Sequence, residues 1–167
     1  MTMKIPLTKG KFAVVDEEDY KWLSKHSWYY TESGYAARDA RNADRTKGRI
    51  IYMHKLICPS DNQTDHINRD SLDNRKANLR PATGSLNTAN RGIQSNNSSG
   101  YKGVSWAKGS NKWSVDIWLN RKKYYLGLFD DKDEAARVYN FWALDIHGEF
   151  ASLNDIEGKK ITVVARG

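Results

Sequence analysis

The sequence predicts an α+β protein made of two small units joined by a polar linker. Short runs rich in aromatic and β-branched residues, typical of strands, are separated by turn residues, and one later segment repeats apolar residues at helical spacing. Residues 93–100 ("IQSNNSSG") are small and polar and show no periodicity, which is typical of a linker. We therefore expect units at 1–92 and 101–154, with a tail at 155–167 that has no assigned role.

The first 50 residues predict a small α+β arrangement. The run "KFAVV" at 11–15 is a strand candidate. Residues 16–24, "DEEDYKWLS", predict a short helix, because Asp16 stands at the N-cap position and acidic residues fill the first turn. Aromatic runs lie on both sides of "ESG" within 27–38, and this pattern predicts a β-hairpin.

Residues 101–154 predict a three-stranded antiparallel sheet packed on one helix. The strands are "YKGVSWA", "KWSVDIWLN" and "KKYYLGLF". Asp131 and Glu134 form a capping box at the start of the helix, and Gly148 is placed to end it. One helix face is expected to be apolar, through Ala135, Val138, Tyr139, Trp142 and Ile146. One face of the sheet is then covered by the helix and the other is open.

The open face combines basic and aromatic residues. Alternation in the middle strand places Trp113, Val115, Ile117 and Leu119 on one side and Ser114, Asp116, Trp118 and Asn120 on the other. Between 101 and 126, six basic residues (Lys102, Lys108, Lys112, Arg121, Lys122 and Lys123) stand against one acid. Such a ribbon can enter the DNA major groove. Alternatively, Trp118 covers a local apolar patch and the lysines are only solvated.

Composition sets wider bounds. The 167 residues include 27 Lys and Arg and 20 Asp and Glu, for a net charge of +7, which favours a polyanionic partner; a merely soluble basic protein is the alternative. The lone Cys58 excludes an intrachain disulfide and a cysteine-based zinc knuckle, and favours a reducing, cytoplasmic setting. We expect no secretory signal and no membrane segment, because no apolar run is long enough.

The segment "DHINRDSLDNRKANLR" at 65–80 is rich in amide and imidazole side chains. Asp65 offers a hard oxygen ligand for Mg²⁺, and the neighbouring His66 can accept a proton from water near neutral pH. Asn87, in "SLNTANR", offers an amide oxygen as a second ligand. Asn74 and Asn78 suit turns that hold such a site rigid. Taken alone, an Asp-His pair is more often a surface pair or an N-cap.

Together with "MHKLI" at 53–57, these two stretches resemble the HNH endonucleases of the phage or homing type. The stretches "VDEEDY" and "GYAAR" resemble the N-terminal portion of the same proteins. The resemblance implies a ββα-metal site in which Asp65 and Asn87 bind Mg²⁺ or Mn²⁺. It also implies that His66 is the general base and that Asn78 fixes the hairpin loop. His54 would support the site, or else is a core histidine.

The motifs "YKGV", "YLGLFD", "EAARVYN" and "HGEFASLN" resemble the Apetala-type, ethylene-response-factor-like DNA-binding domain. That resemblance implies a sheet lying in the major groove. Contacts would come from Lys102, Gly103, Ser105, Lys112, Asp116, Trp118, Lys123, Tyr125 and Tyr139. Several positions that are Arg in plant members are Lys102, Ser105, Ala107, Trp118 and Lys123 here. Because Lys lacks the bidentate fork of Arg, we expect looser base specificity.

Three arginines, Arg75, Arg80 and Arg91, could bind phosphate, and Arg91 is the expected DNA contact; an exposed surface arginine is the alternative. The sequence thus favours an Mg²⁺-dependent DNA endonuclease that nicks duplex DNA. It would act as a monomer without a protein partner, inside a bacterial host cell if a phage encodes it. The alternatives are a non-enzymatic DNA-binding regulator with a degenerate HNH region and, less favoured, an RNA-binding protein.

Overall fold

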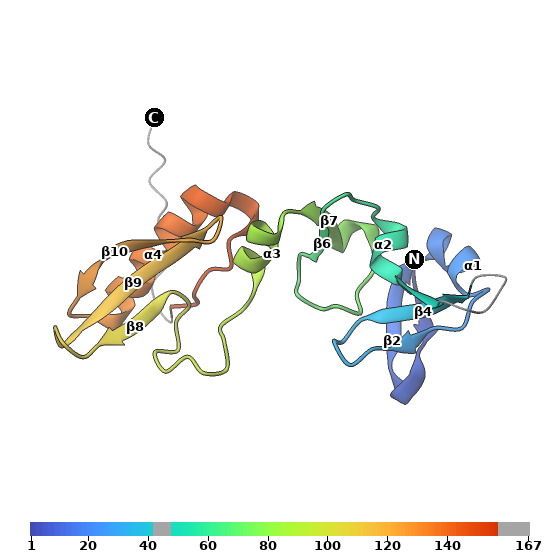
Figure 1. Cartoon of the computed structure of the whole chain (residues 1–167), viewed down its shortest axis with the longest axis horizontal. Helices are drawn as coiled ribbons and strands as arrows, with labels where there is room; N and C mark the ends of the chain where they lie inside the picture. Colours follow the sequence, from blue (N-terminus) through green and yellow to red (C-terminus); the bar gives the residue numbers. More distant parts are fainter. Residues whose placement is uncertain (42–47, 157–167) are drawn as a thin grey trace. The chain divides into compact units, whose positions relative to one another are not determined.

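The computed structural model describes residues 1–41 and 48–156, and the chain divides into two compact units, Met1–Asn90 and Arg91–Gly167 (Figure 1). Small antiparallel sheets and helices build both units, which confirms the α+β class. Residues 157–167 of the expected tail lie outside the described residues. Within the described ranges, every helix is too short or too polar to cross a bilayer.

The first unit opens with a hairpin followed by a helix. Strands β1 (Thr2–Pro6) and β2 (Phe12–Asp16) pair antiparallel on either side of the 3₁₀ turn η1 (Thr8–Gly10), which confirms the predicted strand. Helix α1 (Glu17–Leu23) begins after Asp16 as predicted. The Asp16 side chain does not cap the helix, however. Its Oδ2 accepts a hydrogen bond from the backbone N–H of Lys76 at 2.8 Å, so a distant loop uses it instead.

A second sheet comprises β3 (Tyr29–Tyr30), β4 (Ala36–Arg41) and β5 (Gly48–Tyr52), in that order. The antiparallel pairing of β3 with β4 confirms the predicted hairpin. Helix α2 (Met53–Ile57) follows β5 directly. The core of this unit consists of Ile5, Leu7, Ala13, Val15, Leu23, Trp28, Ala36 and Met53.

The first unit ends in a hairpin and a helix. Strands β6 (Gln63–His66) and β7 (Leu79–Ala82) pair antiparallel, and helix α3 (Gly84–Asn90) follows and contacts both. The connection between the strands spans residues 67–78 and ends in the 3₁₀ turn η2 (Lys76–Asn78). The Asn-rich segment therefore forms a β-β-α unit.

The second unit is the predicted three-stranded meander with one helix. Strands β8 (Val104–Ala107), β9 (Lys112–Leu119) and β10 (Lys122–Phe129) are antiparallel neighbours, and α4 (Lys132–His147) packs on one face (Figure 1). The backbone N–H of Glu134 donates to Asp131 at 2.7 Å, and Gly148 caps the helix with φ +53° before the 3₁₀ turn η3 (Gly148–Phe150). Burying Val115 or Ile117 contributes about 2 kcal/mol each.

The prediction was wrong for one residue of the apolar helix face, Trp142. Trp142 is 39% exposed. The buried stripe of α4 instead follows Ala135, Ala136, Tyr139, Asn140 and Ala143. Alanines let the helix approach the sheet closely, whereas an indole at this interface would hold the two apart. The bulky Trp142 therefore lies beside the stripe, where it contacts Phe141 edge-on.

Candidate functional site

The β6–β7 register places the predicted metal ligand Asp65 beside Arg80, and helix α3 adds Asn90; neither contact was predicted. Asp65 lies opposite Arg80, and His66 lies opposite Leu79. Asp65 as a whole residue is 3% exposed. Its Oδ2 accepts from Arg80 Nε at 2.9 Å and lies 2.8 Å from Arg80 Nη2. Asn90 Nδ2, from the last residue of α3, lies 3.0 and 3.1 Å from the two carboxylate oxygens.

Asn87, the predicted second ligand, lies next to a different residue. Its Nδ2 donates to Gln63 Oε1 at 2.6 Å. Gln63 and Asp65 are two positions apart on β6, so their side chains share one face of the strand. Asn87 and Asn90 are three positions apart on α3 and share one helix face. The helix thus presents two carboxamides along β6, and Asn90 is the one that reaches Asp65.

The sequence analysis assigned no role to Asn90 and did not pair Arg80 with Asp65. A signal for Asn90 was present, because the i, i+3 spacing from Asn87 places both amides on the same helix face. Arg80 carries no comparable local signal. Its neighbour across the hairpin depends on how residues 67–78 turn, and sequence spacing alone does not set that register.

His66 is buried among polar and aromatic groups. Its Nε2 lies 3.5 Å from Asn74 Oδ1, and its ring centroid lies 5.3 Å from that of His54 and 5.9 Å from that of Tyr35. Burial lowers the pKa of His66, although the bond to Asn74 and the charge of Asp65 oppose that shift. The imidazole is therefore neutral at neutral pH, which is the form that accepts a proton.

His54 lies beside His66 as a second buried imidazole. It is 8% exposed, and its Nδ1 has no hydrogen-bond partner among the described residues. Burial, followed by the nearby charge of His66, lowers the pKa of His54 to about 4. Tyr52 stacks on the His54 ring, with centroids 5.5 Å apart. His54 is thus a neutral aromatic neighbour of His66.

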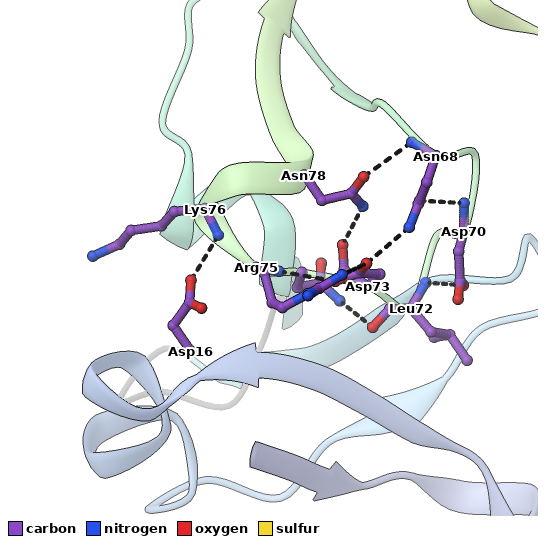
Figure 2. A network of polar contacts seen from close by, with 9 residues as sticks. Asp16, Asn68, Asp70, Leu72, Asp73, Arg75, Lys76 and Asn78 are labelled. Atoms are coloured by element: carbon purple, nitrogen blue, oxygen red, sulfur yellow. Dashed lines mark hydrogen bonds and ion pairs between the residues drawn. The ribbon is translucent and has the colours of Figure 1, made fainter. Parts of the chain in front are cut away.

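A polar network fixes the loop at 67–78 (Figure 2). Asn78 Nδ2 donates to the backbone carbonyl of Asp73 at 2.8 Å, and Asn78 Oδ1 accepts from the backbone N–H of Asn68 at 2.9 Å. Arg75 donates to both oxygens of Asp73 at 2.7 and 2.6 Å. Asn78 thereby ties the beginning of the loop to its end, close to where His66 leaves β6.

The side chains around Asp65 include residue types that hard divalent cations prefer, although the atoms that contact its carboxylate here are N–H groups of Arg80 and Asn90. Among the residues that the structure describes, no three His, Cys, Asp or Glu side chains gather closely enough to hold a metal. One carboxylate, Asp65, lies near the carboxamide-bearing face of α3. Mg²⁺ binds through one or two carboxylates and neutral oxygens while keeping several waters, so these residue types fit it chemically.

The second unit presents the predicted open sheet face. Its side chains include Trp118, which is 57% exposed, and Tyr125, which is 61% exposed. Lys123 lies opposite Trp118, Tyr125 opposite Asp116, and Ser105 opposite Ser114. The opposite side of β9 is buried through Val115 and Ile117. The face is therefore aromatic and polar, as alternation predicted.

Acidic residues offset the lysines of this face. Lys123 Nζ lies 3.0 Å from Asp116 Oδ2, and Lys112 Nζ lies 3.1 Å from Asp130 Oδ2. Lys102 Nζ donates to the backbone carbonyl of Arg91 at 2.6 Å, and Arg91 itself is exposed. The lysines predicted to contact DNA thus have protein partners within the second unit.

Tyr139 does not lie on the open face. It is 3% exposed, and burial raises its pKa to about 12. Gly103, with φ +73°, packs on the Tyr139 ring so closely that an added Cβ would lie 2.0 Å from Cδ2. The Tyr139 side chain packs in the core between α4 and the sheet, so the structure does not favour the predicted DNA contact from Tyr139. The absence of a side chain at Gly103 allows the backbone to pack directly on the Tyr139 ring.

Comparisons with known proteins agree with both motif sets, although no family model matches the chain. An uncharacterized HNH endonuclease, L560, of Acanthamoeba polyphaga mimivirus is 31% identical over 154 residues, 89% of this chain and 78% of the relative. Protein 3.8 of Escherichia phage T7 is 31% identical over 87 residues, 52% of this chain and 71% of that protein. The AP2-like ethylene-responsive transcription factor TOE2 of Arabidopsis thaliana is 34% identical over 80 residues, 48% of this chain but 16% of the plant protein.

Proposed function

This chain belongs to the HNH endonuclease family, and on that premise we propose that it is a metal-dependent DNA endonuclease that nicks one strand of duplex DNA. The observation that carries the proposal is the β-β-α unit that joins buried Asp65 and His66 to the amide-bearing helix α3. One such site per chain acts on one phosphodiester bond at a time, so a monomer would nick.

Asp65 would hold the cation, Mg²⁺ or Mn²⁺, together with a carboxamide oxygen from α3, which the sequence motif assigns to Asn87. The cation would neutralise charge on the scissile phosphate and on the leaving 3′ oxygen. Asn78 would keep the loop in shape, and His54 would exclude water from one side of the base.

His66 would accept the proton of the attacking water, because its imidazole is buried and neutral. A bond forms between the water oxygen and phosphorus, and the bond from phosphorus to the 3′ oxygen breaks. The leaving oxygen takes up a proton, so the products carry a 5′ phosphate and a 3′ hydroxyl. Asn74 would orient the imidazole from its other side.

The second unit would bind duplex DNA through its open face. The proposed contacts are Lys102, Gly103, Ser105, Lys112, Asp116, Trp118, Lys123 and Tyr125, with Arg91 at the phosphate backbone. Tethering a binding face to the nuclease raises the local concentration of the site at DNA. The T7 relative makes the cytoplasm of a bacterial host the proposed place of action.

A supercoiled-plasmid assay tests the proposal. With Mg²⁺, we expect conversion to open circle that vanishes with EDTA and with His66→Ala. The control His26→Ala, which changes an exposed histidine of the same unit, should nick normally. Tight duplex binding without nicking on a range of plasmids would instead support a DNA-binding regulator with an inactive HNH region.

A further inference from the structure

The proposed metal ligand is already paired with a cation of the protein itself. Arg80 approaches Asp65 Oδ2 through Nε at 2.9 Å and Nη2 at 2.8 Å. Both side chains are sheltered, with Arg80 11% and Asp65 4% exposed. The guanidinium therefore occupies a carboxylate oxygen that a divalent cation would use.

Two cations on one buried carboxylate repel each other strongly, because little water screens them. A buried carboxylate without any partner is also unfavourable, so the metal-free chain needs a countercharge at Asp65. From these two requirements we propose that Arg80 is an exchange residue. Its guanidinium neutralises Asp65 until a divalent cation binds, and then moves to the scissile phosphate. This inference rests on the function proposed above.

A phosphate is the natural new partner for Arg80. Asp65 lies opposite Arg80 in the β6–β7 pairing, so a phosphate held at Asp65 through a cation would be within reach of the Arg80 side chain. The planar guanidinium can donate two parallel hydrogen bonds to phosphate oxygens. Arg80 would thus contact the reacting group and stabilise its charge in the transition state.

Asn90 can hold Asp65 in position while the Arg80 guanidinium moves away from it. Its Nδ2 bonds both Asp65 oxygens and also the backbone carbonyl of His66 at 2.9 Å. This amide is neutral, so it does not repel an incoming cation. It therefore keeps Asp65 and the start of the loop in position while the guanidinium leaves.

The first test measures Mn²⁺ affinity by calorimetry on the full chain without DNA. We expect Arg80→Gln to tighten Mn²⁺ binding about tenfold or more, since a competing charged hydrogen bond is lost. Arg80→Lys should tighten it less, and Asp65→Asn should abolish it. Arg49→Gln is the control, because Arg49 is an exposed arginine of the same unit outside the proposed site and should leave Mn²⁺ affinity unchanged.

The second test measures single-turnover nicking at saturating Mn²⁺. We expect Arg80→Gln to be slower by about a hundredfold despite its tighter metal binding. A merely structural Arg80 would instead leave Mn²⁺ binding of Arg80→Gln unchanged or weaker, whereas a lower melting temperature is expected in either case because Asp65 loses its countercharge. If Arg80→Gln does not fold, Arg80→Lys provides both readouts.

The outcomes separate this inference from the proposed function. Unchanged or weaker Mn²⁺ binding in both folded Arg80 variants would overturn the exchange. If wild-type protein still nicks and Asp65→Asn does not, the endonuclease proposal stands without it. A wild-type chain that neither binds Mn²⁺ nor nicks would overturn both.

Discussion

The backbone N–H of Asn74 donates to the carbonyl of Val14 at 2.7 Å, which joins the loop beside His66 to the first hairpin of the chain. The N–H of Val14 returns a bond to Leu72 at 2.8 Å, so β2 and the loop form a short parallel bridge. Asn74 Oδ1 then faces His66 Nε2. The N-terminal hairpin therefore helps to fix the group that orients the proposed base.

Replacing Asn74 by alanine should slow nicking about tenfold to a hundredfold, as losses of such supporting contacts do. The bond from Asn74 raises the pKa of His66, so its loss should also move the acid limb of the pH–rate profile to lower pH. Single-turnover rates between pH 5 and pH 8 would measure both effects. Asn62→Ala, at an exposed position of the same unit, is the control. An unchanged pH–rate profile would show that Asn74 does not influence the proton-accepting imidazole of His66.

Acid should destabilise the first unit through His54. The pKa of His54 falls from 6.5 to about 4 in the folded chain, so the unfolded chain binds the extra proton between these values. Stability should therefore rise with pH across this window and fall by about 3 kcal/mol as pH drops from 6.5 to 4. Urea unfolding at several pH values would measure it. His54→Phe should flatten the dependence and exposed His26→Phe should not; equal slopes for the two variants would contradict the assignment.

Gly103→Ala should destabilise the second unit by about 3 kcal/mol or more, because the new methyl would collide with the Tyr139 ring at a residue with positive φ. Gly109→Ala is the matched control, since an added Cβ there meets nothing within 4 Å. Denaturant unfolding followed by tryptophan fluorescence would compare the two. Equal stabilities would show that β8 can shift away from α4.

Trp118→Ala should weaken duplex DNA binding by about 1–2 kcal/mol, roughly a tenfold rise in Kd, without loss of stability. The indole is 57% exposed on the open face, so it contributes little to folding. Trp142→Ala removes a comparably accessible indole from α4 and should leave Kd unchanged. Fluorescence anisotropy with a labelled duplex would measure both. Equal losses from the two variants would argue against the open face as the binding surface.

The parts of this fold that sequence could predict are those set by local patterns. The alternation in 112–119 gave the correct faces of β9, and the capping residue Asp131 gave the correct start of α4. Trp142 was placed wrongly because helical spacing does not reveal that alanines will form the closest contact. Both β9 and α4 have the predicted periodicity. On α4, packing against the sheet buries the alanine-lined side of the helix and leaves Trp142 outside it.

The partners within the candidate site depended on tertiary structure. Asp65 and His66 could be singled out from chemistry and motif spacing, but their neighbours could not. The Arg80 pairing depends on hairpin register, and the Asn90 contact depends on how α3 docks on β6. Asp16 shows the same limit, since its predicted cap was replaced by a bond to Lys76 across 60 residues of sequence.

The bond between Asp16 and Lys76 also bears on how the protein folds. Contacts between residues far apart in sequence form late, because the intervening chain must first lose its entropy of loop closure. The loop beside His66 depends on such contacts with β2 and Asp16. A nascent or partly folded chain would then contain Asp65 and His66 without the loop that positions them. The order of folding itself would delay the proposed nuclease activity until the first unit is complete.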